Sequence, residues 1–346
     1  MREPLFRTRI TELFGIRHPL LCGGLMWLGD GRYVAAVVNG GGMGFITALA
    51  FPDPEEFRRQ VHLCRELTGG KPFGVNISVP RRPGYKERVA RHIDITIEEQ
   101  VRFVETAGGS PDWFIDRLKA AGCVVIHKVP GIKYLASAER LGVDAVSLIG
   151  AEAGGHPGIV LMGTMVQGAQ LREATSLPCV IGGGIGAGRQ LVAALALGAD
   201  GVLMGSRMLA STEMWSHPEY KRRVVSGDGT DSRLCMLTFK DTHRVLANES
   251  SDAVAALEAA GVRDIEQYRE HIDGRLTRRA YETGDFKRGM IDYGQAVAFV
   301  DEIESVEAIF DRIIDDARRS LARLDEVTVE RQDNARGRQP DEARSA

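Results

Sequence analysis

The sequence has few cysteines, no excess of charge of one sign and no long apolar run. Its five cysteines are spread over 346 residues without a C-x-x-C pair, which argues against a disulfide framework. Lys and Arg total 44 and Asp and Glu total 47, a net charge of −3, so the basic excess of nucleic-acid-binding and membrane-surface proteins is missing. The apolar stretch 191–205 is interrupted by Asp200 and is too short to span a membrane. We therefore expect a cytoplasmic protein with no nucleic-acid or membrane partner.

Motifs for metal binding and serine catalysis are also missing. The sequence contains no H-E-x-x-H motif, no His/Cys cluster and no G-x-S-x-G elbow, so we predict no metal site. Glycine, in contrast, is abundant. It accounts for 40 of 346 residues, where roughly 7% is usual. Because there is no G-x-y repeat, this excess indicates tight turns and close approaches of the backbone to a ligand.

Residues 1–212 alternate short apolar segments with amphipathic ones. Eight apolar segments are predicted strands: Pro19–Gly24, Met43–Thr47, Phe73–Ser78, Val101–Glu105, Cys123–His127, Asp144–Leu148, Pro178–Gly182 and Gly201–Met204. The predicted helices between them include Pro54–Leu67, Pro111–Ala121, Lys133–Leu141 and Arg189–Leu197. Strands that are each followed by a helix predict a parallel sheet. Eight such units without a switch point favour a closed (β/α)8 TIM barrel over an open doubly wound sheet.

The glycine-rich rhythm ends at residue 212, and charge-rich helical patterns follow. The predicted helices here are Pro218–Val225, Asp252–Ala260, Ile265–Ile272 and Val306–Leu324. We interpret residues 213–290 as a smaller helical cap domain packed on the barrel. Residues 326–346 are polar and aperiodic, which predicts a disordered tail.

Two glycine clusters predict a phosphate site at the C-terminal end of the barrel. Gly182, Gly183 and Gly184 follow the seventh strand, and Gly205 and Ser206 follow the eighth. Such loops present backbone N–H groups, and in this fold they frequently hold phosphate. The alternative is that the glycines only form tight turns. Two clusters in the matching strand positions favour the phosphate site.

Three polar side chains within or after predicted strands are candidate functional residues. His156 stands between Gly154-Gly155 and Pro157, in a loop suited to present one side chain, which favours catalysis over a structural role. Lys128 ends the fifth strand, and the pattern leaves open whether it points into the barrel mouth or to solvent. Asn76 lies within an apolar strand and is either a ligand contact or a satisfied core amide. His127 is interpreted as a core residue or one that lies behind the site. The other histidines have contexts typical of surface or structural residues: His18, His62, His92, His217, His243 and His271.

Together these segments resemble the nitronate monooxygenase family, formerly called 2-nitropropane dioxygenases. The resemblance is carried by Gly23-Gly24-Leu25-Met26-Trp27, Gly74-Val75-Asn76, His127-Lys128, Glu152–Gly158, Gly182-Gly183-Gly184 and, especially, Leu191–Ala210. It covers roughly residues 5–325. Known nitronate monooxygenases have Ala-Pro-Met after the first strand, where this chain has Gly23-Gly24-Leu25. That difference is closer to a sister group of NAD(P)H:quinone reductases, and enoyl-acyl carrier protein reductase II shares the Gly-Gly-His motif.

The resemblance implies an FMN-binding TIM barrel with an appended helical domain. It implies that His156 is the catalytic residue and that segment 291–325, through Gly294-Gln295, returns to the barrel mouth. The FMN-contacting residues that it implies are Gly24, Leu25, Met26, Asn76, Ser78, Lys128, Gly154, Gly155, Gly182, Gly183, Gly184, Gly205 and Ser206.

Two enzymatic functions and one non-enzymatic function are compatible with this site. The leading hypothesis is oxidation of alkyl nitronates with O2, with Lys128 stabilising the anionic flavin and His156 as acid/base. The alternative is NAD(P)H-dependent reduction of a quinone or enoyl thioester at the same FMN. A phosphate-ligand binding barrel without activity is the third. The expected partners are a small-molecule substrate with O2 or NAD(P)H, and the sequence leaves a homodimer open.

Overall fold

The chain forms a closed barrel of eight parallel strands in a computed structural model, which describes residues 3–79 and 84–328. The strands are β1 Leu20–Cys22, β2 Met43–Thr47, β3 Gly74–Val79, β4 Phe103–Gly108, β5 Val124–Val129, β6 Ala145–Ile149, β7 Cys179–Gly182 and β8 Gly201–Met204. They pair in sequence order, and β1 closes the barrel against β8. The predicted TIM barrel is therefore confirmed, and the bounds of β2 and β8 are those expected from the sequence.

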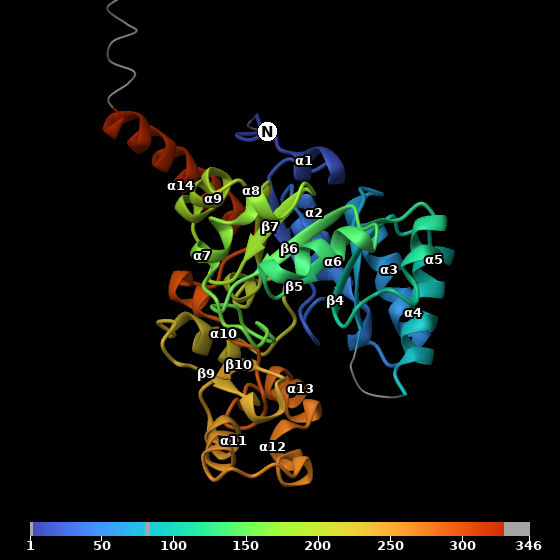
Figure 1. The fold of residues 1–346 in the computed structure, drawn as a ribbon, viewed down its shortest axis with the longest axis vertical. Coiled ribbons are helices and arrows are strands. Elements are labelled where there is room, and N and C mark those ends of the chain that lie inside the picture. Colours follow the sequence, from blue (N-terminus) through green and yellow to red (C-terminus); the bar gives the residue numbers. More distant parts are fainter. Residues whose placement is uncertain (1–2, 80–83, 329–346) are drawn as a thin grey trace, which may run out of the picture.

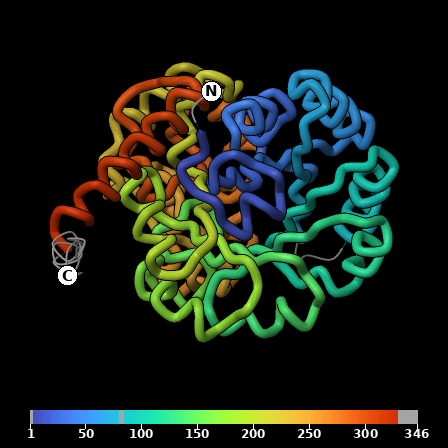
Figure 2. The backbone as a smooth tube through the Cα atoms, turned by 90° about the horizontal axis from the view of Figure 1, so that it is seen from above, coloured from blue at the N-terminus to red at the C-terminus, as the bar shows by residue number. Residues whose placement is uncertain are grey.

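Helices cover the outside of the barrel (Figures 1 and 2). They are α2 Gly31–Asn39, α3 Pro54–Thr68, α4 Lys86–Glu98, α5 Ile115–Ala120, α6 Leu135–Arg140, α7 Thr164–Gly168, α8 Leu171–Ala174 and α9 Gly188–Ala196. The amphipathic helix α3 begins at the cap residue Asp53, with Pro54 in its first turn, and ends at Gly69 in the left-handed conformation. Its buried side chains, including Phe57 and Val61, belong to the main core, and the helix packs against α2 and α4.

A short N-terminal helix, α1 Arg9–Phe14, lies at the opposite end of the barrel from the predicted site. Phe14 packs edge-on against Phe45 and Phe103 from β2 and β4. Arg9 forms an ion pair with Asp200 at 2.7 Å, which joins this helix to the turn before β8. These contacts fill the N-terminal end with apolar side chains, so a ligand must enter from the C-terminal end.

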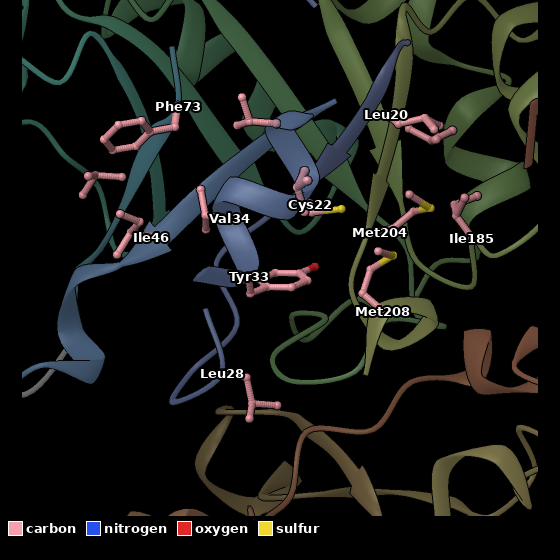
Figure 3. Close-up of a cluster of buried hydrophobic side chains, with 14 of the residues drawn as sticks. Leu20, Cys22, Leu28, Tyr33, Val34, Ile46, Phe73, Ile185, Met204 and Met208 are labelled. Carbon is pink, nitrogen blue, oxygen red and sulfur yellow. The ribbon is translucent and has the colours of Figure 1, made fainter. Parts of the chain in front are cut away.

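The main core lies between the strands and the surrounding helices. Figure 3 shows Cys22 of β1 and Met204 of β8 close to Tyr33 of α2 and to Met208, just after β8. Leu28, in the loop after β1, points away from the strands and towards the cap. The core therefore continues from the barrel wall into the junction between barrel and cap.

The cap contains a small β-sheet as well as helices, unlike the helical domain expected from the sequence. Its strands β9 Ser232–Cys235 and β10 His243–Leu246 are antiparallel. Its helices are α10 Pro218–Val225, α11 Glu249–Ala259, α12 Arg269–Ile272 and α13 Gly274–Thr283. The cap has its own cluster of buried side chains, including Cys235, Val254 and Tyr268.

The chain returns from the cap to the barrel after residue 289. Asp292 forms an antiparallel bridge with Val245 of β10, and Gly294 donates a hydrogen bond to the Ser206 hydroxyl after β8. Helix α14, Val306–Val327, then packs along α9 and α2. The expectation of disorder from residue 326 is wrong at its start, because the helix continues to Val327. Residues 329–346 of the predicted tail lie outside the described residues.

Candidate active site

A buried carboxylate connects residues of β3, β4 and β5 with the loop after β1. Glu105 of β4 is fully buried, and its Oε1 lies 3.1 Å from Lys128 Nζ of β5. Its Oε2 accepts hydrogen bonds from Asn76 Nδ2 of β3 at 2.6 Å and from the Gly24 amide at 2.8 Å. Lys128 therefore points inward, which resolves the alternative that the sequence left open. The Ser78 hydroxyl extends the network by donating to Asn76 Oδ1 at 3.1 Å.

The loop after β1 lies directly against this network. A methyl group added at Gly24 would come within 2.3 Å of Asn76 Cγ, so only glycine allows this approach. The Leu25 carbonyl accepts hydrogen bonds from the Thr47 hydroxyl and from amides further along the same loop. Leu25 and Met26 remain partly exposed. The loop thus offers backbone and apolar side chains beside the cluster of Glu105, Asn76 and Lys128.

The glycine loops after β7 and β8 present unused backbone donors. Gly183 and Gly184 have φ values of +107° and +70°, a left-handed conformation that favours glycine. Among the described residues, the amides of Gly183, Gly184 and Gly205 donate no hydrogen bond. An added Cβ at Gly205 would meet only Leu25 Cδ2, at 3.6 Å. Free amides and open space are the features of an anion site.

A cavity of about 410 Å³ adjoins the β7 loop. Gly183, Gly184 and Glu152 line it, together with Gln295 and Phe299 from the returning segment. Gly182, which ends β7, lies outside its lining. A larger cavity of about 540 Å³ lies at α1, at the opposite end of the barrel, and contains none of the predicted site residues.

The loop after β6 presents His156 and is fixed to the cap. Gly155 and Arg244 of β10 exchange two backbone hydrogen bonds, of 3.0 and 2.7 Å. Gly154 packs so closely on the returning segment that an added Cβ would lie 2.5 Å from the Gly294 amide. His156 Nδ1 lies 3.1 Å from the Thr242 carbonyl oxygen, and its ring stacks on His243 with centroids 4.3 Å apart.

The surroundings of His156 favour its neutral form. Burial within the surrounding protein and the charge of His243 lower the pKa of His156, while Asp292 and Asp241 oppose this. Because the side chain is 58% exposed, water weakens these effects. A carbonyl oxygen only accepts, so the contact with Thr242 places the proton of neutral His156 on Nδ1 and leaves Nε2 free to take a proton.

The structure thus places the predicted site residues in three groups: those around Glu105, those around Gly294, and His156. Glu105 connects Gly24, Asn76 and Lys128, with Ser78 joined through Asn76, and Gly294 connects Ser206 to Gly154. The partners of His156 come from the cap and its linker.

Sequence reasoning missed three residues. Glu105 carried a usable signal, because a carboxylate inside an apolar strand needs a partner. His243 was interpreted as a surface or structural residue; it is largely buried, its ring stacks on His156, and its Nε2 lies 2.6 Å from Asp292 Oδ1. No local pattern marked His243 or Asp292.

The described residues contain neither a cluster of metal ligands nor a helix that could span a membrane. Over residues 3–79 and 84–328, no group of three or more His, Cys, Asp or Glu side chains is arranged to hold a metal ion. None of the helices in the same ranges is both long and apolar enough to cross a bilayer.

Comparison with known proteins identifies a family and two kinds of relative. The profile of the nitronate monooxygenase family matches residues 7–316. A Rhodococcus jostii protein named (3aS,4S,5R,7aS)-5-hydroxy-7a-methyl-1-oxo-octahydro-1H-indene-4-carboxyl-CoA dehydrogenase is 35% identical over 74% of this chain and 69% of its own. A probable nitronate monooxygenase of Staphylococcus aureus is 28% identical over 65% of this chain and 74% of its own. Among solved structures, FabK from Thermotoga maritima superposes with a TM-score of 0.85 and 33% identity, covering 93% of this chain and 100% of FabK.

Proposed function

Because the chain belongs to the nitronate monooxygenase family of oxidoreductases, we propose that it uses FMN to exchange two hydrogen atoms with a bulky thioester substrate. The observation that supports a bulky substrate is the exposure of His156 and of the loop that carries it. The imidazole is 58% exposed, and Ile159 and Val160 on the same loop are 49% and 44% exposed. Exposed apolar side chains on the loop that carries the proposed catalytic group suit a large substrate that covers them on binding.

The residues at the barrel mouth fit FMN. The amides of Gly183, Gly184 and Gly205 match a phosphate monoester, which needs hydrogen-bond donors. The buried side chains of Glu105 and Asn76, with Lys128 beside them, supply the mixed donors and acceptors that a flavin ring requires. When bound there, FMN supplies two-electron chemistry by accepting or delivering a hydride.

This chain's residues position the substrate and move a proton. His156 Nε2 removes the proton from the carbon next to the thioester carbonyl, and the hydride of the adjacent carbon would pass to FMN bound at the barrel mouth, which leaves a C=C bond in the substrate. In the reverse reaction, His156 returns the proton and NAD(P)H is the source of the hydride. Lys128 supplies positive charge near the flavin, and Glu105 holds the ammonium in place.

Oxidation of an alkyl nitronate with O2 is the second candidate. The family match and the S. aureus relative favour it. A nitronate is small and already anionic, so it needs charge from Lys128 more than it needs the open apolar loop. The R. jostii carboxyl-CoA dehydrogenase, at 35% identity, is more similar to this chain than the S. aureus protein, at 28%, and this favours the thioester.

Anaerobic mixing of the FMN-loaded protein with candidate reductants separates these functions. NADH, NADPH, a saturated CoA thioester and propyl-3-nitronate are added separately while the visible flavin absorbance is followed. The proposal expects bleaching by the thioester or by a reduced nicotinamide, and reoxidation of the nicotinamide-reduced flavin by an unsaturated CoA thioester. Bleaching by the nitronate alone would select the second candidate. Reoxidation by quinones but not by enoyl thioesters would identify a quinone reductase.

A further inference from the structure

The cap places a second imidazole on His156. His243 belongs to β10, and its ring lies against the His156 ring with an interplanar angle of 22°. Gly155 precedes His156 in the chain, and Arg244 follows His243. The two backbone hydrogen bonds between Gly155 and Arg244 therefore hold the segments that carry the two histidines together. His243 is only 14% exposed, whereas His156 is 58% exposed. The inner ring is therefore held by protein on most sides, and the outer ring remains accessible.

A carboxylate holds the inner imidazole. His243 Nε2 lies 2.6 Å from Asp292 Oδ1, and Asp292 stands on the segment that returns from the cap to the barrel. Burial by itself raises the pKa of Asp292, but the hydrogen bond and charge of His243 bring it below its usual value. Asp292 is therefore a carboxylate, and His243 Nε2 donates to it.

We propose that His243, held by Asp292, is a positioning residue for proton transfer, so that the cap completes the active site. The stacked ring fixes the plane of His156, and the Thr242 carbonyl fixes its Nδ1–H form, so that Nε2 stays available for the substrate. The inference rests on the proposed function only in assigning proton transfer to His156.

The charged groups around His156 come from three segments. His243 lies on β10, Asp241 lies in the loop before it with Oδ1 3.7 Å from His156 Nδ1, and Asp292 lies on the returning segment. Arg244 turns away, since its guanidinium donates to the Ala151 carbonyl and to the Ser232 hydroxyl. His243 and Asp292 therefore act on His156 with opposite signs, which separate substitutions can reveal.

The test is an NMR titration of the FMN-loaded, full-length protein labelled with 15N-histidine, with the His156 signals assigned from His156→Asn. His243→Phe keeps a stacked ring and removes the imidazole that lowers the pKa of His156, while Asp292, which raises that pKa, remains, so the His156 titration midpoint should move to higher pH. Adding Asp292→Asn should bring the midpoint back towards the wild-type value. Asp241→Asn alone, the control for sensitivity to charge, should lower it. If His243→Phe is not recovered folded, His243→Gln replaces it with the same expectation.

Turnover supplies the second readout. His243→Phe should lower kcat by roughly 10–100-fold, because the phenyl ring has no hydrogen bond to Asp292 and therefore orients His156 less firmly than the imidazole does. The ionisation in the kcat/KM profile should move in the same direction as the NMR midpoint. An unchanged His156 midpoint in folded, FMN-loaded His243→Phe would overturn the inference. Absence of turnover with every thioester would contradict the proposed function and leave the NMR result standing.

Discussion

Removing Lys128 should expose how strongly the barrel mouth depends on its ion pair. Lys128→Met keeps the apolar stem and removes the ammonium that lies 3.1 Å from the fully buried Glu105. At an effective dielectric constant of about 20, two unit charges at that distance attract by about 5 kcal/mol. Loss of one partner of a buried pair typically costs about 3–5 kcal/mol. The hydrogen bonds from Gly24 and Asn76 still support the carboxylate, so we expect about 3 kcal/mol.

Glu105→Gln provides the second side of a double-mutant cycle. Its amide oxygen can keep the hydrogen bonds from Gly24 and Asn76, but its NH2 group would then face the Lys128 ammonium. Together with Lys128→Met, that conflict disappears, so the double variant should be more stable than the sum of the single losses predicts. We expect a coupling energy of about 1.5–3 kcal/mol.

Urea unfolding of the FMN-free protein measures the four free energies. The exposed pair Arg278 and Glu282, at 50% and 47% exposure, is the matched control and should couple by less than about 1 kcal/mol. Additivity of Glu105→Gln and Lys128→Met within about 0.5 kcal/mol would refute the claim that these two charges stabilise each other.

Four further outcomes are expected. Gly205→Asp should fold but lose FMN by placing a carboxylate among the free amides, while Gly205→Ala, with open space for its methyl group, should retain FMN on absorbance analysis. Gly24→Ala should lower stability by about 1–3 kcal/mol in thermal unfolding, since its Cβ would meet Asn76 at 2.3 Å; an unchanged Tm would contradict the tight approach. His156→Asn should keep FMN but lose roughly 10²–10⁴-fold in turnover; equal loss of flavin and activity would make the residue structural. Burial lowers the pKa of His92 to about 4, so its stabilising contribution is present above pH about 6.5 and is lost as pH falls towards 4; in acid titrations monitored by circular dichroism, His92→Gln should flatten this loss.

The barrel could be predicted because its strands carry their own signals. Each is a short apolar run bounded by glycine or proline, and alternation with helices predicts parallel pairing without knowledge of long-range contacts. The predicted β2 and β8 match the observed Met43–Thr47 and Gly201–Met204. The phosphate site was predicted from the same strand count, because its glycines follow the seventh and eighth strands, and it stays a prediction.

The cap and its contribution to the site could not be predicted in the same way. Strands β9 and β10 are four residues each and carry Arg233 and Arg244 on a sheet of only two strands, so their apolar pattern is weak. The stacking of His243 on His156 joins residues 87 positions apart (243 − 156) through a bridge to Gly155. No local propensity encodes such a contact. Glu105 is different, because its charge within the buried strand β4 was visible in the sequence.

Binding of FMN compared with riboflavin tests the central claim most directly. Riboflavin has the same ring but no phosphate, so it can use the Glu105 network and not the free amides of Gly183, Gly184 and Gly205. Flavin-fluorescence titration of the FMN-free protein should give one FMN per chain, with riboflavin at least about 100-fold weaker, since charge-assisted hydrogen bonds contribute about 1.5–3 kcal/mol each. Equal affinity for the two flavins, or no binding of either, would contradict the account of this barrel mouth as an FMN site.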